Sequence, residues 1–272
     1  MENIEVLIPC MHLDREGIKK LYAFLKVNSD ALFACQCDRN AEEEIKIDGH
    51  DVHIIYSTSR GVSKNRNLLL LHARGDILLM IDDDCVLADD YVASIYTAYG
   101  KYPDADAIRF NTTRIQNGQK CRMVIKDKRA SFKDVSAYGT PGLSLNRERF
   151  FRHDVLFDEN LGVPNYLANG EDSLFLFDLT KKSKHFYVVS AVIANVLEDK
   201  KESTWFKGYN DVYFITKGYI FHKMYPHLYS LVALYHYFNQ KKQYSIAGYK
   251  YLRYKKLIRA GRNYKVGEKY EK

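Results

Sequence analysis

The sequence predicts an α/β fold: a mixed, mostly parallel central sheet flanked by helices, followed by a C-terminal helical extension. Short apolar runs alternate with helical periodicity at intervals of about 15–25 residues over the first hundred positions, which is typical of strand–helix–strand units. Hydrophobic residues make up 46% of the 272 positions, enough to form a core around such a sheet. From about residue 205 the periodicity is that of amphipathic helices.

The expected elements follow in order along the chain. Residues 4–8 form a first buried strand that ends at Pro9. Asp14 can cap the next helix, whose apolar positions recur at helical spacing from Ile18 to Leu25. The other elements expected in the first half are strands at 31–37, 52–56, 77–81 and 107–110 and helices at 63–73 and 89–100.

The second half is expected to be less regular. Loops and short strands are expected up to residue 170. The helices that follow are expected at 171–179, 205–216, 225–238 and 246–259. We therefore expect a catalytic domain over residues 1–200 and a basic, tyrosine-rich helical extension over 201–272. Ligands of parallel sheets bind beyond the carboxyl ends of the strands, so the chemistry is expected at that edge.

Composition and charge exclude several classes of protein. The first residues lack a secretion signal, and the longest apolar stretch, 186–197, is too short to span a membrane. Five cysteines without framework spacing are typical of reduced thiols, so we expect a cytoplasmic protein. The net charge is +7, but it is uneven. Residues 200–272 carry 16 Lys and Arg against 4 Asp and Glu, and they hold 13 of the 22 tyrosines.

Three consecutive carboxylates, Asp82, Asp83 and Asp84, follow the strand at 77–81. Adjacent carboxylates at the mouth of a buried strand repel one another, so a cation is expected to offset them. Residues two apart in extended backbone face the same way, so Asp82 and Asp84 can form part of an oxygen shell for Mg²⁺ or Mn²⁺. Diphosphate oxygens and water would complete that shell. The equally weighted alternative is a solvated turn.

Two further segments could complete such a site. Either Glu171 or Asp172 could take the proton from an incoming hydroxyl, although acidic residues in a helical first turn are more often explained by the helix dipole. Residues 61–67 lie between a strand and a helix, where backbone amides with Arg66 or Lys64 could meet phosphates. Arg66 could equally be a strut to a core carboxylate.

In their order and spacing, these motifs resemble the inverting family 2 glycosyltransferases of bacterial polysaccharide synthesis, which have a GT-A (Rossmann-like) fold. The resemblance covers about residues 3–180 and, more weakly, 205–219. Its motifs are Val6-Leu7-Ile8-Pro9, Asp38, Gly61-x-Ser63-x-x-Arg66-Asn67, the segment 75–84, Gly142, Phe157-Asp158-Glu159 and Gly170-Glu171-Asp172. One departure is Cys37-Asp38-Arg39-Asn40 after the second strand, where the family usually has paired Asp followed by Gly-Ser.

The resemblance implies a role for each motif. Asp84 resembles the principal metal ligand, while Asp82, also a candidate ligand, and Asp83 resemble the ribose and diphosphate contacts. Asp172 resembles the general base, and Glu171 its neighbour on the acceptor side. The other residues implied are Pro9, Cys10, Asp38, Gly61, Arg66 and Gly142 on the donor side and Trp205 on the acceptor side.

The resemblance therefore implies transfer of one sugar from a nucleotide-diphosphate donor, first of all a UDP-sugar, to a hydroxyl. The reaction would be a single displacement with inversion that depends on Mn²⁺ or Mg²⁺. The acceptor would be a glycan or a polyprenyl-diphosphate-linked oligosaccharide, in the synthesis of a surface polysaccharide such as a capsule.

The basic extension suggests a further partner. Tyrosine and tryptophan suit the headgroup region of a bilayer and lysine suits anionic lipid, so we expect these helices to lie peripherally on the inner face of the cell membrane. The alternative is a helical cap whose tyrosines pack on the catalytic core and whose lysines are solvated.

Two other functions compete with this interpretation. A sugar-nucleotide nucleotidyltransferase would have a Gly-rich phosphate loop after the first strand, where this chain has Pro9-Cys10-Met11-His12. A non-enzymatic nucleic-acid-binding protein would suit the basic aromatic extension. The aspartate cluster would repel nucleic acid, so we expect no such partner.

Overall fold

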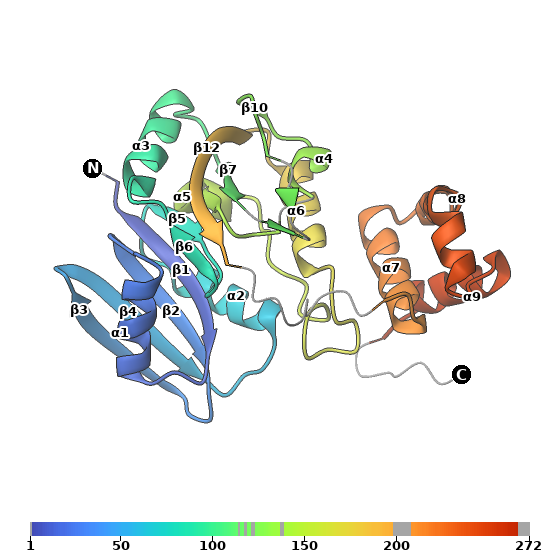
Figure 1. The fold of residues 1–272 in the computed structure, drawn as a ribbon, viewed down its shortest axis with the longest axis horizontal. Helices are drawn as coiled ribbons and strands as arrows, with labels where there is room; N and C mark the ends of the chain where they lie inside the picture. The colour runs from blue at the N-terminus through green and yellow to red at the C-terminus, as the bar shows by residue number, and fades with distance from the viewer. Residues whose placement is uncertain are drawn as a thin grey trace.

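The computed structural model describes residues 2–113, 115–116, 119–120, 123–136, 139–197 and 208–265. Figure 1 shows an α/β body built around one large sheet and, beside it, a group of three helices near the C-terminus. The sheet is mixed and mostly parallel in its first half, and helices flank it, so the predicted fold class is confirmed.

Four parallel strands form the half of the sheet that the apolar runs predicted. They are β1 (Ile4–Met11), β2 (Asp30–Gln36), β4 (His50–Ser57) and β5 (Ile77–Met80), in the spatial order β5-β1-β2-β4. Because all four run in the same direction, their carboxyl ends meet at one edge of the sheet. Both faces of these strands are largely buried, which explains the continuous apolar runs in the sequence.

The other half of the sheet joins strands that are distant in sequence. β11 (Leu143–Asn146) runs antiparallel between β5 and β7 (Ala107–Thr113), and β12 (Phe186–Val196) runs parallel to β7. The smaller strands are β3 (Ala41–Ile47) beside β4, β6 (Cys85–Leu87) and β10 (Lys128–Arg129) against β12, and the separate pair β8 (Ile115–Gln116) and β9 (Gln119–Lys120). The sequence-based elements did not include β3 and β12.

Helices cover both faces of the sheet and bury a separate core on each. The helices on one face are α1 (Arg15–Phe24) and α3 (Tyr91–Lys101). The helices on the other face are α2 (Val62–His72), α4 (Phe132–Val135), α5 (Arg147–Phe151) and α6 (Glu171–Lys182). As predicted, Asp14 caps α1, and its carboxylate accepts from the backbone N–H of Gly17 at 2.8 Å.

The three C-terminal helices are α7 (Asp211–Met224), α8 (Tyr229–Ile246) and α9 (Tyr251–Arg262). Asn210 caps α7, so this helix begins later than the expected residue 205; residues 198–207 lie outside the described part of the chain. α7 and α9 meet backbone to backbone. A Cβ on Gly218 would lie 2.2 Å from the carbonyl oxygen of Ile258, so only glycine allows this crossing.

Tyrosines fill the interior of this three-helix unit. Tyr237, Tyr244, Tyr249 and Tyr254 are buried together around Phe214. These side chains therefore pack against one another inside the three-helix unit and are not available to lipid headgroups. Among the described residues, no helix is both long enough and apolar enough to cross a membrane.

Candidate active site

One buried guanidinium, that of Arg66 on α2, gathers carboxylates from two distant segments. Its Nη2 donates to Asp82 Oδ1 at 2.9 Å, and its Nη1 donates to Asp172 Oδ1 at 2.6 Å and lies 3.8 Å from Glu171 Oε1. The Arg66 side chain is 6% exposed, and the three carboxylates are between 17% and 32% exposed. Asp82 follows β5, so the cluster lies at the carboxyl edge of the parallel strands, where the chemistry was expected.

Polar contacts at the start of α2 fix this helix against the sheet. The backbone N–H of Gly61, whose φ is +131°, donates to Gln36 Oε1 at 2.8 Å. Asn65 Nδ2 donates to the carbonyl oxygen of Ala34 at 2.9 Å. Both acceptors belong to β2, so the helix is tied to the end of a central strand. These contacts hold Arg66 on the buried side of α2.

The backbone around the start of α6 approaches its neighbours so closely that it requires glycine. Gly170 has a φ of +95°, and a Cβ at this position would lie 2.2 Å from Cδ1 of Ile220 on α7. A Cβ on Gly139 would lie 2.8 Å from Asp172 Oδ2. Thr140 Oγ1 donates to Asp172 Oδ1 at 3.4 Å. The first turn of α6 is therefore confined by α7 on one side and by the 139–140 turn on the other.

The charges of this cluster perturb one another. Burial alone would lower the pKa of Arg66, but Asp172 and Asp82 outweigh it and raise that pKa. Burial raises the pKa of Asp172 despite the attraction of Arg66. Burial and the neighbouring Asp172 raise the pKa of Glu171 to about 7, and Glu171 Oε2 is buried without a hydrogen-bond partner among the described residues. A carboxyl that titrates near neutral pH is typical of a site for proton transfer.

The aspartate cluster continues from Asp82 toward solvent. Loss of hydration and repulsion by Asp82 and Asp84 raise the pKa of Asp83 to about 6. Asp84 accepts a hydrogen bond from Cys85 Sγ at 3.3 Å, and its carbonyl oxygen accepts from the backbone of Leu197. This concentration of carboxylate oxygens fits a hard divalent ion. Within the described ranges, no three His, Cys, Asp or Glu side chains are grouped so that they could hold a metal ion by themselves.

The remaining residues expected in the donor site differ in their exposure to solvent. Pro9 is half-buried at the end of β1, whereas Cys10 is only 2% exposed and belongs to the core. Asp38 is exposed and pairs with Arg60. Arg60 also donates to the carbonyl oxygen of Cys37 at 2.7 Å, so it ties down the end of β2. Arg60 is missing from the sequence-based site; its signal was a basic residue shortly after a parallel strand, since β4 ends at Ser57.

Gly142 lies where the sheet changes from parallel to antiparallel. Its N–H donates to the carbonyl oxygen of Met80 at 2.8 Å. Its φ is +83°, and a Cβ would lie 2.8 Å from Nη1 of the buried Arg109 and 2.9 Å from Cγ2 of Thr112. Arg109, which donates to the carbonyl oxygen of Pro141, was also missing from the sequence-based site. Trp205 lies outside the described residues.

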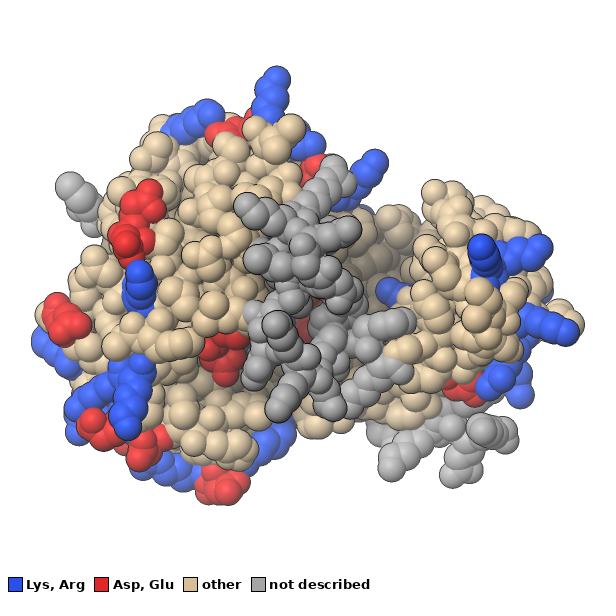
Figure 2. All heavy atoms as spheres, viewed as in Figure 1, with Lys and Arg blue, Asp and Glu red and all other residues tan. Residues whose placement is uncertain are grey.

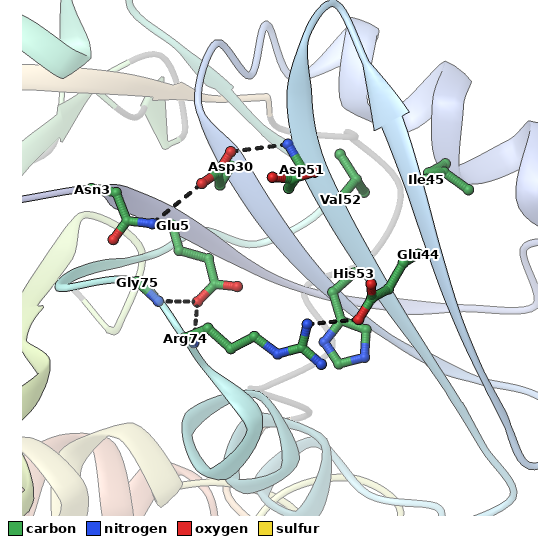
Figure 3. A pocket seen from close by; sticks show the side chains of 10 residues that line it. All are labelled: Asn3, Glu5, Asp30, Glu44, Ile45, Asp51, Val52, His53, Arg74 and Gly75. Carbon is green, nitrogen blue, oxygen red and sulfur yellow. Dashed lines mark hydrogen bonds and ion pairs between the residues drawn. The ribbon is translucent and has the colours of Figure 1, made fainter.

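A cavity of about 290 Å³ lies at the opposite edge of the sheet, among the amino ends of β1, β2 and β4 (Figure 3). Glu5 Oε2 accepts from the backbone N–H groups of Arg74 and Gly75 at 2.6 and 2.8 Å. Arg74 Nη1 donates to Glu44 Oε1 at 2.7 Å (Figure 3). These polar groups are paired with one another and join β1 and β3 to the turn before β5, which indicates a structural role.

Comparison of the sequence with known protein families identifies one family. The sequence profile of glycosyl transferase family 2 matches residues 19–155, half of the chain. That segment runs from α1 through the aspartate cluster and Gly142 to the end of α5. No curated protein sequence matches the chain.

Solved structures of S. aureus TarS share the fold. TarS 1–349 in complex with UDP-GlcNAc superposes with a TM-score of 0.61 at 14% identity, over 81% of this chain and 66% of that one. The complex of TarS 1–349 with UDP gives 0.58 at 12% identity, over 81% and 65%. The chain thus spans less than two thirds of the length of these structures. The profile match over half of the sequence shows that this chain belongs to glycosyl transferase family 2.

Proposed function

We propose that the enzyme moves a single sugar from a nucleotide-diphosphate donor to a hydroxyl by single displacement with inversion. The observation that carries this proposal is the Arg66 cluster, in which one guanidinium contacts Asp82 after β5 and Asp172 at the start of α6. A single displacement needs a leaving-group site and a base on opposite sides of the reacting carbon. Here the two carboxylates come from different elements at one sheet edge.

Asp172 would act as the general base. Its carboxylate would take the proton of the acceptor hydroxyl while that oxygen bonds to the anomeric carbon. The bond from this carbon to the diphosphate oxygen breaks, and the electron pair leaves with the diphosphate. Arg66 orients Asp172 through the 2.6 Å contact, and burial raises the pKa of Asp172, which makes it a stronger base than an exposed aspartate. Glu171, with its unpartnered Oε2, would contact the acceptor.

The donor would bind beside the aspartates. Asp84 and Asp82 would hold Mn²⁺ or Mg²⁺ together with diphosphate oxygens, and the ion would offset the negative charge of the leaving diphosphate. The raised pKa of Asp83 supports this, because it reflects loss of hydration together with repulsion by the neighbouring carboxylates of Asp82 and Asp84. The other donor-side residues would be Pro9, Asp38, Gly61, Asp83 and Gly142. The UDP-GlcNAc and UDP complexes of TarS make a uridine nucleotide the first donor to test.

Calorimetry with UDP, with and without Mn²⁺, tests the donor site. We expect Asp84→Ala to weaken Mn²⁺-dependent UDP binding by about tenfold or more, because a charged ligand is lost. Asp89→Ala is the control: this exposed carboxylate pairs with Lys26, away from the cluster, and its loss should leave UDP binding unchanged. Unchanged metal-dependent binding in Asp84→Ala would remove the ligand assignment.

A transfer assay tests the base. We expect Asp172→Asn to keep UDP binding but to lower transfer by roughly 10²- to 10⁴-fold, the usual contribution of a general base. Wild-type rates of transfer in this variant would rule out Asp172 in that role. Release of pyrophosphate in place of nucleoside diphosphate would instead indicate a nucleotidyltransferase.

We further propose where the enzyme works. Residues 1–200 would form the catalytic domain, and residues 201–272 an extension that keeps it at the inner face of the cell membrane. The acceptor there would be a growing glycan or a polyprenyl-diphosphate-linked oligosaccharide of a surface polysaccharide. The excess of Lys and Arg in residues 200–272 supports this placement, because anionic lipid attracts such segments.

A further inference from the structure

Exposed apolar side chains recur along the outward face of α8. Five large side chains on or beside this helix are well exposed: Leu228 at 54%, Leu231 at 64%, Tyr235 at 71%, Phe238 at 59% and Ile246 at 79%. Their spacing places them on one side of the helix. We call these five residues the α8 stripe. It spans about 27 Å, the length of 18 residues of α-helix.

The α8 stripe is not needed to fold the three-helix unit. The opposite side of α8 carries Ala233, Tyr237 and Tyr244, which are buried in the aromatic core. A helix that already buries one apolar side gains nothing from a second unless another surface covers it. Several large exposed apolar side chains on one face of a helix indicate an interaction site. Leu252, at the start of α9, is also 80% exposed.

The charge around the stripe restricts what can cover it. Between residues 223 and 265 the chain has ten Lys and Arg and no Asp or Glu. Lys242 lies on the same side of α8 as the stripe, and Lys241 flanks it. Neither lysine forms an ion pair with another described residue. Figure 2 shows Lys and Arg side chains around this part of the molecule.

An anionic bilayer matches both properties. A second copy of the chain would bring two strongly basic surfaces together, which is electrostatically unfavourable. A nucleic acid would meet the basic charge but leave the leucines, Phe238 and Ile246 without an apolar environment. The headgroup region of an anionic bilayer offers negative charge outside and acyl chains beneath, the arrangement that helices with an apolar face flanked by lysines bind.

We propose that α8 lies in the plane of an anionic bilayer with the α8 stripe inserted below the headgroups. This sharpens the proposed membrane placement, on which it rests, and replaces the tyrosines expected from the sequence with a defined set of mainly aliphatic and phenyl side chains. Lys241 and Lys242 contact the lipid phosphates. Tyr235 is the one tyrosine of the stripe, placed where its hydroxyl can reach the headgroups.

Vesicle flotation of the full chain tests the proposal. The vesicles are phosphatidylcholine alone, or phosphatidylcholine mixed with phosphatidylglycerol. We expect the wild type to float only with the mixed vesicles, and Leu231→Ser/Phe238→Ser to lower the partition coefficient by about tenfold or more. Phe24→Ser/Leu71→Ser is the matched control, because both side chains are exposed apolar groups on the catalytic body, at 53% and 62%. This control should float like the wild type.

The charge arm uses Lys241→Glu/Lys242→Glu, with Lys20→Glu/Lys184→Glu as a control of equal charge change at exposed sites on the body. Only the first pair should abolish flotation at low salt. The proposal is overturned if the wild type ignores the mixed vesicles, or if the Leu231/Phe238 variant floats as well as the wild type. A lipid-independent change of oligomeric state in that variant would also overturn it and identify a chain–chain interface.

Transfer to a soluble acceptor, measured in parallel, separates this proposal from the proposed function. The stripe variant should retain wild-type transfer in solution, because none of its altered residues belongs to the site around Arg66. Loss of flotation with transfer intact supports the α8 stripe. Wild-type flotation by the stripe variant, with transfer intact, rejects the stripe and leaves the glycosyltransferase assignment standing.

Discussion

Replacement of Arg66 with methionine would remove the guanidinium that contacts Asp82, Glu171 and Asp172. Removing one partner of a buried ion pair costs about 3–5 kcal/mol, since the remaining charge is left uncompensated. The carboxylates keep up to 32% of their side-chain surface in solvent, so we expect the lower end, a loss of about 3 kcal/mol at pH 8. In a chain of this size that corresponds to a melting temperature lower by roughly 6–12 °C.

The loss of stability caused by Arg66→Met should depend on pH, and this dependence tests the prediction more strictly than the loss at a single pH. The folded-state pKa of Glu171, about 7, already lies above its ordinary value, so the folded protein binds protons more readily than the unfolded chain does. Arg66 also lowers the pKa of Asp172 against the effect of burial, so its removal would raise that pKa further. Protonation then relieves the repulsion, and the destabilisation should shrink as the pH falls from 8 through 7 toward 5. Urea denaturation at several pH values measures this.

The outcome that would refute this reasoning is a loss below about 1 kcal/mol at pH 8, or a loss that grows as the pH falls. Arg152→Met is the matched control, because its ion pair with Glu148 is 66% and 81% exposed and should contribute little. If Arg66→Met does not fold at neutral pH, Arg66→Met/Asp172→Asn removes one of the stranded charges and should recover part of the stability.

Two further predictions concern the surroundings of this cluster. Tyr219→Phe removes the hydroxyl that donates to Asp158 Oδ2 at 2.7 Å, a contact between α7 and the loop before α6. We expect urea denaturation to show a free energy of unfolding lower by about 1–2 kcal/mol, and we expect slower transfer with UDP binding unchanged. Unchanged stability together with an unchanged rate would contradict this prediction. The second prediction concerns Glu171: the rate of wild-type transfer should rise with pH as this carboxyl ionises near 7. Glu171→Gln should lack this rise in its pH–rate profile. If the rise persists in the variant, it belongs to another ionising group.

The parallel half of the fold was predictable because its signals are local. Each strand is an apolar run, and each helix carries its own periodicity or cap, as at Asp14. β3 was not predicted because residues 42–44 are three glutamates, which suggest a solvated loop. It forms as an exposed edge strand on β4, where Glu43 and Glu44 pair with Arg39 and Arg74. β12 was not predicted because its partners, β6, β7 and β10, lie far earlier in the chain.

The candidate site was predictable in its members but not in its arrangement. Residue types and spacing indicated Arg66, Asp82 and Asp172, yet the sequence left Arg66 equally suited to phosphates and to a carboxylate. The contact that decides its position joins residues 106 positions apart, which no local pattern reveals. The same holds for the C-terminal extension. Its composition revealed many tyrosines and lysines, but only the packing of α7 to α9 shows that Tyr244 is buried and that Tyr235 is exposed.

The glycine crossing of α7 and α9 has a consequence for the chemistry at the sheet. Gly218 and Gly261 leave no side chains between the two backbones that could rearrange, so α7 cannot slide along α9 without a steric clash. Two residues beyond Gly218, Ile220 abuts Gly170, the residue before Glu171. The fixed packing of α7 on α9 therefore holds Ile220 against the start of α6 and limits the movement of that helix. A chain that ends before α7 would lack this contact, so the first turn of α6, with Glu171 and Asp172, would be less constrained.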